Sequence, residues 1–439
     1  MNNPKSSFRA ILLLVIMQGL VTGSVHAIEE NISEHKSSKE SKEHEHGSHL
    51  ECPLPNNVQD IISCALEFHP SIKKENYNLD ISDQSLKKES QIPNPTLSSR
   101  YTQGKVEGKD VSELEANLAF VLELGGKRSS RQNYAKAQKG EAIANYDLVR
   151  AEVKQETILN LYRLRQVLEE RNLIKESLTA FSKIISRLKN LPRLSAEQEA
   201  SLMLFELAHE ETKVNESELF EEEKKLEHYF HIATGHSLDE ISDLLPAYPK
   251  KWPKIKLPVD KNSHSVTTKR LKAKSDIALQ ELELQKSDAW PNLKIGPSLG
   301  IEKEGSVENK MIGFNIQLPI PLFNANGGGK AFARSKLIKA QRSMALSVAE
   351  ENHERFEQLQ VYQSAIRVLN KTMKRNLIEK KHQKIENMYL RGIISSSLYL
   401  DSLKQKFSYL KSRNSREMAA ITALWNVYKY DGKIFKENI

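Results

Sequence analysis

The sequence has few of the features that an enzyme core or a membrane-spanning helix requires. Beyond residue 27 no stretch of about 18 consecutive residues is apolar, so this part encodes no hydrophobic transmembrane helix. Only 39% of the 439 residues are hydrophobic and 28% are charged, a balance that favours long exposed helices over a thick core. The H-E-x-x-H, G-x-S-x-G and phosphate-loop motifs are missing as well. We therefore predict that the chain is not an enzyme.

The charge is nearly balanced. Lys and Arg number 65 against 57 Asp and Glu, which gives a formal net charge of +8. The excess is scattered through Lys- and Glu-rich segments, and no motif interleaves aromatic with basic residues. Because a nucleic-acid footprint is normally a concentrated basic patch, we predict no nucleic-acid partner.

The first 27 residues have the pattern of a secretory signal peptide. Lys5 and Arg9 precede a short apolar run, Ala10 to Met17, and Val25-His26-Ala27 forms a small-x-small cleavage site. The alternative is a membrane anchor, but the run is shorter than the roughly 20 residues that a spanning helix needs.

A histidine-rich segment follows, at residues 28–53. His44, His46, His49 and Cys52 give the spacing H-x-H-x₂-H-x₂-C, and imidazole and thiolate are good ligands for Zn²⁺, Cu and Ni²⁺. The alternative is a charged, disordered spacer that happens to contain histidine. We expect no resident cofactor and, at most, a transient divalent ion on this segment.

Only two cysteines are present, Cys52 and Cys64. They lie close together in the sequence, and in an oxidising compartment they could form a disulfide. Two free thiols are equally consistent with the sequence.

The stretch PIPLFNANGGGK, residues 319–330, predicts a junction between a strand and a helix. Apolar residues stand at every second position from Ile312 to Ile320, which is the period of a strand with one apolar face. After Gly327, Gly328 and Gly329, the run from Lys330 to Arg391 contains no Gly or Pro, and its composition favours helix. About 60 helical residues would extend roughly 90 Å.

The same pattern occurs earlier in the chain. Apolar alternation from Leu114 to Leu124 leads into Gly125 and Gly126, and a helical run then continues to Asn190. We therefore predict an internal two-fold repeat. Its halves span residues 54–243 and 265–432, a proline-rich linker lies at 244–264, and a short tail occupies 433–439.

Both halves also share a turn after the long helix. LPRLSAEQEASL, residues 191–202, matches RGIISSSLYLDSL, residues 391–403. Each half thus reads helix, strand, strand, long helix, sharp turn, returning helix. Four strands cannot close a barrel alone, whereas three chains would supply about twelve.

With these paired motifs, NPTL with LELGGKR and WPNL with PIPLFNANGGG, the chain resembles the TolC-like outer-membrane efflux proteins, nearest the heavy-metal cation (CzcC-like) branch. The resemblance covers about residues 54–432. It implies a mainly α fold with a small β portion: long antiparallel α-hairpins form a periplasmic α-barrel, and four strands per chain complete a trimeric 12-stranded outer-membrane β-barrel.

The resemblance also implies partners and a location. It implies a homotrimer in the outer membrane of a Gram-negative cell, in contact with lipid and with a large periplasmic portion. It implies docking to a periplasmic adaptor and to an inner-membrane pump of the resistance-nodulation-division class. The implied activity is export of heavy-metal cations.

Several site residues follow from the resemblance. Asp401 matches a position where the family can place an acid facing the closed aperture; the alternative is a solvent-facing helix residue. The adaptor-docking tips would be Leu191, Arg193, Leu194, Ser195, Arg391, Gly392, Ile393, Ile394 and Ser395.

Two alternatives remain open. The same type of channel could export organic compounds or polypeptide. A different class of protein, a periplasmic metal-binding coiled-coil scaffold, would also explain the helices and the histidines, but not the four alternating strands.

Overall fold

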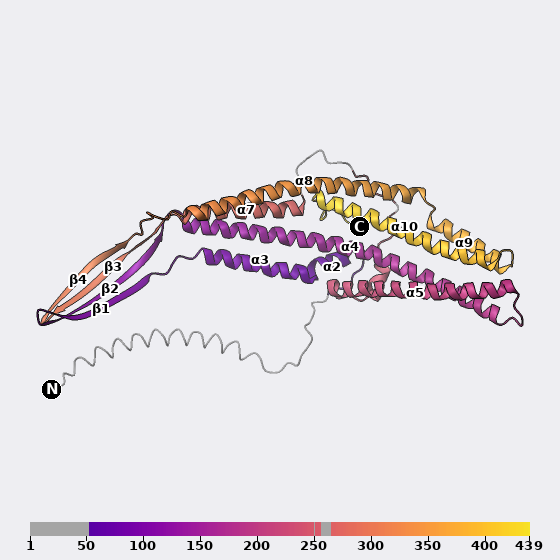
Figure 1. Cartoon of the computed structure of the whole chain (residues 1–439), viewed down its shortest axis with the longest axis horizontal. Helices are drawn as coiled ribbons and strands as arrows, with labels where there is room; N and C mark the ends of the chain where they lie inside the picture. Colours follow the sequence, from indigo (N-terminus) through magenta and orange to yellow (C-terminus); the bar gives the residue numbers. More distant parts are fainter. Residues whose placement is uncertain (1–51, 250, 256–264) are drawn as a thin grey trace, which may run out of the picture. The chain divides into compact units, whose positions relative to one another are not determined.

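The computed structural model describes residues 52–249, 251–255 and 265–439. These residues form long helices and one four-stranded sheet (Figure 1). The predicted signal peptide and His44, His46 and His49 lie outside the described residues.

The first half of the described chain runs from helix through two strands into two long helices. Its elements are α2 (Val58–Phe68), α3 (Pro70–Glu89), β1 (Thr96–Val106), β2 (Lys109–Glu123), α4 (Lys127–Lys189) and α5 (Ala196–Thr234). Two short helical turns follow, α6 (Leu238–Ile241) and η1 (Ser242–Leu244).

The second half has the same order of helix, two strands and long helices. Its elements are α7 (Val266–Ser287), β3 (Asn292–Glu304), β4 (Val307–Gln317), α8 (Gly327–Lys371), α9 (Arg375–Leu390) and α10 (Ser396–Tyr430). The mainly helical fold with a small four-stranded portion, which the sequence predicted, is confirmed.

The sheet is antiparallel with the order β1-β2-β3-β4. The two halves of the chain meet at its centre, where Leu114 of β2 is opposite Ile301 of β3. Gly296 of β3 lies so close to β2 that an added Cβ would be 1.7 Å from the carbonyl oxygen of Leu118. Only glycine fits at this crossing.

The outer strands β1 and β4 are exposed along their whole length. Within the part of the chain that the structure describes, each pairs on one side only. On β4, Ile312, Phe314 and Ile316 are 87%, 64% and 66% exposed. Alternate residues of a strand lie on one face, so β4 presents an unburied apolar face next to an unpaired edge.

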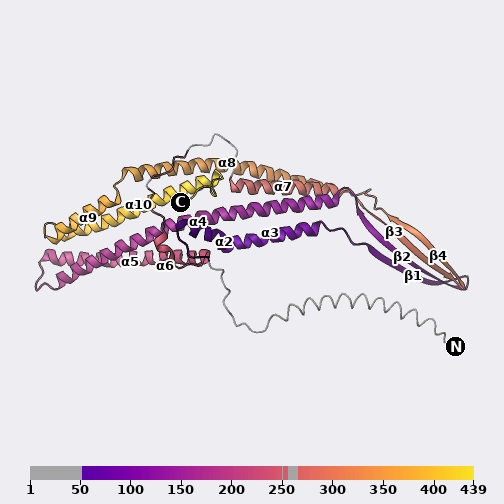
Figure 2. The same cartoon turned by 180° about the vertical axis from the view of Figure 1, so that it is seen from behind.

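Among the helices, α4 lies alongside α3, α5, α7 and α10, and α8 lies alongside α7 and α10 (Figures 1 and 2). The main core unites α2, α4, α5 and α10 and includes Ile61, Leu161, Phe230 and Trp425. Apolar stripes on long helices thus supply the core.

A buried ion pair crosses this core. Arg165 of α4 and Glu417 of α10 are 7% and 4% exposed, and the shortest distance between their charged groups is 2.8 Å. Arg165 also donates a hydrogen bond to the carbonyl oxygen of Pro246, so it ties α4 to α10 and to the chain segment after η1.

The structure corrects one prediction. The uninterrupted helix expected from Lys330 to Arg391 is broken between Lys371 and Arg375, and it forms α8 and α9 instead. Side chains of α10 form hydrogen bonds at the break. Arg413 donates to the carbonyl oxygen of Leu369 and to the side-chain Oγ1 of Thr372, and Tyr409 donates to the carbonyl oxygen of Met373. Tertiary contacts thus override a composition that favours helix.

The described part of the predicted linker is packed against the helices. The ring of Tyr248 lies between two guanidinium groups, those of Arg165 and Arg375, each 3.8 Å from its centroid. Tyr362 of α8 donates a 2.7 Å hydrogen bond to the carbonyl oxygen of Pro253. Among the described residues, no helix has both the length and the apolar composition needed to cross a membrane.

Candidate functional site

The junction between β2 and α4 is built around the predicted hinge glycines. Gly125 and Gly126 have φ angles of 68° and 72°, a region that favours glycine. A Cβ on Gly125 would lie 2.4 Å from Cγ and 2.6 Å from Cβ of Trp290, whereas one on Gly126 would meet nothing within 4 Å. Gly125 is therefore required both for its backbone angle and for contact with Trp290.

This junction brings together motifs from the two halves of the sequence. Lys127 Nζ donates a 2.7 Å hydrogen bond to Oδ1 of Asn292, and Arg131 forms an ion pair with Glu123 that clamps the first turns of α4 to the end of β2. Trp290, Asn292 and Arg131 were not among the predicted site residues. The WPNL motif, which the sequence repeats in the NPTL form, contained the signal for the first two.

The second junction uses its glycines differently. Gly327, Gly328 and Gly329 form the first turn of α8, and the left-handed residue is Asn326, with φ of 55°. Asn326 Nδ2 donates to the backbone oxygen and to Oε1 of Gln285, both at 2.9 Å. The close contact falls on Gly329, where a Cβ would lie 2.4 Å from Gln285 Oε1. The turn is therefore fixed by an asparagine that sequence reasoning did not single out.

The two predicted tips have matching local structures. Ser195 caps α5, accepting from the N–H of Gln198, whose side chain accepts from the N–H of Ser195. Ser395 caps α10 by accepting from the N–H of Leu398. Such caps end the preceding turn and start the returning helix.

Each tip also leaves apolar side chains in solvent. Leu191 and Ile393 are 40% and 61% exposed, Arg193, Arg391 and Gly392 are exposed, and Leu194 and Ile394 are half-buried at equivalent positions. Gly392 adopts a φ of 71°, which closes the α9–α10 turn.

The two tip hairpins share one apolar cluster. Phe181 of α4 and Phe205 of α5 pack with Tyr399 and Leu403 of α10, and the partly buried Ile394 joins them. The tips of both halves are thus held together within one chain.

Beside this cluster, α9 and α10 bury two basic side chains. His382 is 8% exposed, and its ring stacks at 16° on that of Tyr399. Burial, followed by the positive charge of Lys406, lowers the pKa of His382 below its usual value. Lys406 in turn forms a 2.8 Å ion pair with Glu379, and burial raises the pKa of Tyr399 to about 12.

Asp401 lies in the second turn of α10 and is exposed. It has no hydrogen-bond or ion-pair partner among the described residues. Its carboxylate therefore faces solvent in the single chain, as either reading of the sequence requires.

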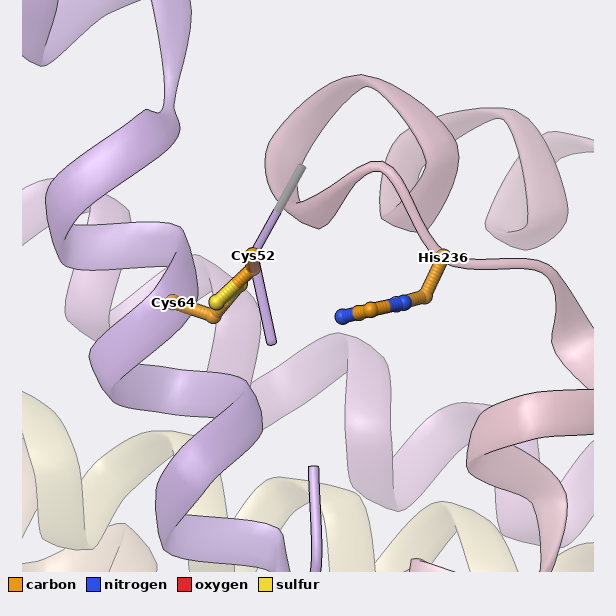
Figure 3. Close-up of side chains that lie close together, drawn as sticks. All are labelled: Cys52, Cys64 and His236. Carbon is orange, nitrogen blue, oxygen red and sulfur yellow. A yellow bond between two sulfur atoms is a disulfide. The ribbon is translucent and has the colours of Figure 1, made fainter. Parts of the chain in front are cut away.

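Of the four residues predicted to bind metal, only Cys52 is described. It forms a disulfide with Cys64 of α2 (Figure 3). The pairing that the sequence left open is therefore present in this structure.

Comparison with known proteins supports the architecture at the level of the fold. No protein-family model matches the sequence, and no curated protein matches it significantly. Solved structures do match. The Campylobacter jejuni CmeC outer membrane channel superposes with a TM-score of 0.65 at 15% identity, covering 86% of each chain.

Two further channels agree. The Vibrio cholerae outer membrane protein VceC matches with a TM-score of 0.62 at 15% identity, over 85% of this chain and 96% of VceC. The open state of the Neisseria gonorrhoeae MtrE outer membrane channel matches with a TM-score of 0.61 at 14% identity, over 86% and 89% of the two chains. The chain has the fold of these outer-membrane proteins. At such low identity the likeness establishes the fold, and the function is argued separately.

Proposed function

We propose that the chain is the outer-membrane channel component of a tripartite efflux system of the resistance-nodulation-division class, and that its cargo is heavy-metal cations. The observation that carries the proposal is the shared fold, which extends over 85% or more of this chain in the three comparisons above.

The sheet supports assembly into a homotrimer. Its outer strands β1 and β4 have unpaired edges within the described chain, and unpaired edges are not viable in lipid. If β4 of one chain pairs with β1 of the next, three chains give a closed barrel of twelve strands. The exposed apolar face of β4 then lies against lipid, and the helices form a periplasmic tube.

The tips support docking to an adaptor. Their exposed residues Leu191 and Ile393 are apolar, and the caps at Ser195 and Ser395 hold the turns in defined conformations. In the trimer, these turns would lie at the periplasmic end of the tube, where a periplasmic adaptor and the inner-membrane pump would engage them.

The metal cargo rests on the sequence. His44, His46 and His49 form a metal-ligand pattern, and the paired motifs are nearest the heavy-metal branch of the family. Asp401, three times around an axis, would add an anionic ring that favours cations.

A deletion strain tests both the channel and its cargo. Growth is measured on zinc, cobalt, cadmium, nickel, copper and silver salts, and on detergents and dyes. We expect sensitivity to one or a few metals, restored by the wild-type gene. Sensitivity to organic compounds only would keep the channel and refute the metal cargo. The gene carrying His44, His46 and His49 as alanines shows whether the segment is needed.

Fractionation separates the channel from the scaffold alternative. A channel is recovered in the outer-membrane fraction as a trimer after mild detergent extraction. A coiled-coil scaffold would appear in the soluble periplasmic fraction, and that result would overturn the proposal.

A further inference from the structure

The disulfide lies beside a buried histidine that follows the end of α5. Cys52, Cys64 and His236 each offer one ligand atom, and these atoms all lie within 4.8 Å of one another (Figure 3). Cys64 and His236 are 2% and 5% exposed. They are far apart in the sequence, and the packing of α2 against α5 brings them together.

The imidazole ring of His236 points toward the sulfur atoms, and its nitrogen on that side, the buried Nε2, has no hydrogen-bond partner among the described residues (Figure 3). A buried polar atom without a partner costs about 1–3 kcal/mol. A ligand bound in another state of the protein is one way in which such an atom is satisfied.

The other side of the ring is held by a carboxylate. Nδ1 of His236 lies 3.5 Å from Oε2 of Glu240. That carboxylate is itself fixed, because Oε2 accepts hydrogen bonds from the N–H and the hydroxyl of Ser237 at 2.8 and 3.1 Å. A carboxylate behind a histidine orients the ring and places the free nitrogen toward a metal.

The local backbone produces this arrangement. Gly235 ends α5 in the left-handed conformation, with φ of 80°, so the chain turns sharply and returns His236 toward α2. The N–H of His236 donates to Thr234 Oγ1 at 3.3 Å, and Cys64 Sγ lies 3.6 Å from the carbonyl oxygen of Thr234.

We propose that Cys52, Cys64 and His236 form a thiol-dependent binding site for a soft or borderline cation such as Zn²⁺, Cd²⁺ or Cu⁺, and that the disulfide closes it. Around tetrahedral zinc, two sulfur ligands lie about 3.8 Å apart, and sulfur and nitrogen about 3.5 Å. The Cα atoms of the two cysteines are 5.9 Å apart, so both thiolates can reach one ion. A solvent molecule would complete the coordination.

A thiol reductant converts the closed, disulfide-bonded form of the site into the open form with two free cysteines. Two small-molecule thiols transfer two electrons to the Cys52–Cys64 bond, which breaks, and their own sulfurs join in a disulfide. Their two protons pass to the cysteine sulfurs. When the cation binds, the cysteines become thiolates and these protons leave to solvent. The inference concerns the residues of this cluster and does not depend on what the channel exports.

Metal titration of the full mature chain in detergent tests the site. All proteins carry His35, His44, His46 and His49 as alanines, so that the segment at residues 28–53 supplies no imidazole. We expect the reduced protein to bind one Co²⁺ per chain with a thiolate charge-transfer absorption that Zn²⁺ abolishes by displacement. The oxidised protein should show no such absorption.

Variants assign the ligands. His236→Gln should weaken binding at least tenfold, Glu240→Gln should weaken it about tenfold, and Cys52→Ser should remove the absorption. His231→Gln is the matched control, since His231 is an exposed histidine in the last turn of α5, five residues before His236, and it should leave binding unchanged. Equal affinity in His236→Gln and the control would overturn the assignment.

A measurement on the unmutated cluster covers the case in which a variant does not fold. X-ray absorption of the reduced, zinc-loaded protein should show two sulfur ligands and one imidazole nitrogen. A first shell with no sulfur, or without imidazole, would refute the site.

Discussion

Replacing Gly125 with alanine should lower the free energy of unfolding for two reasons, and comparison with Gly126 separates them. The first is the backbone angle: a φ of 68° is unfavourable for any residue with a Cβ, by about 1–2 kcal/mol. The second is contact. The new Cβ would lie 2.6 Å from Cβ of Trp290 and 2.4 Å from its Cγ. Because the backbone fixes the position of the Trp290 Cβ, no side-chain rotation can relieve that contact.

Gly126 provides the matched control. Its φ is 72°, but its added Cβ would meet nothing within 4 Å. Gly126→Ala should therefore cost only the backbone term, about 1–2 kcal/mol. Gly125→Ala should cost about 1–3 kcal/mol more, as expected for overpacking.

The assay is urea unfolding of the purified protein in detergent, followed by circular dichroism of the helices. A second substitution tests the contact. Trp290→Gly should recover the contact part of the Gly125→Ala loss, whereas Trp290→Ala should recover only a fraction of it, because it retains the Cβ at 2.6 Å. Equal losses for the two glycine variants would refute the reasoning, as would full rescue by Trp290→Ala.

Three further predictions concern the helical region. Glu417→Ala removes the closest carboxylate from the buried Arg165 and leaves it only the 3.9 Å contact with Glu169. It should lower stability by about 3 kcal/mol, measured by urea unfolding, and the double change of Arg165 and Glu417 to Met should recover most of this loss. The depressed pKa of His382 favours its neutral form in the folded protein; stability is thus highest above the unfolded pKa of about 6.5 and falls as pH drops toward the folded pKa. Melting curves across this range should show the decline, and His382→Gln should flatten it. Asp401→Asn should lower the cation selectivity of the channel in planar bilayers. Glu350→Gln is the control, because it removes an exposed carboxylate of α8, and it should leave the selectivity unchanged. Equal effects of the two substitutions would refute the aperture ring.

The strands and the hinges were predictable because their signals are local. Alternation from Leu114 to Leu124 and from Ile312 onward places strands at β2 and β4, and the glycines mark where each helix begins. The apolar alternation nevertheless continues to Ile320, three residues past the end of β4, because pairing with β3 decides where the strand stops.

Other features depend on residues that are distant in the sequence. The break between α8 and α9 contains no Gly or Pro, and the side chains that stabilise it, Arg413 and Tyr409, belong to α10. His236 stands in an ordinary helix-ending sequence, and only the packing of α2 against α5 brings it to Cys64. No pattern of spacing could have indicated either contact.

The unpaired strand edges have a consequence for how the protein is made. In the described part of the chain, β1 and β4 each have a free edge, and the apolar side chains of Ile312, Phe314 and Ile316 are exposed. This combination promotes aggregation. If the chains assemble as proposed above, productive association competes with misassembly, and the yield should depend on how quickly each new chain meets its neighbours.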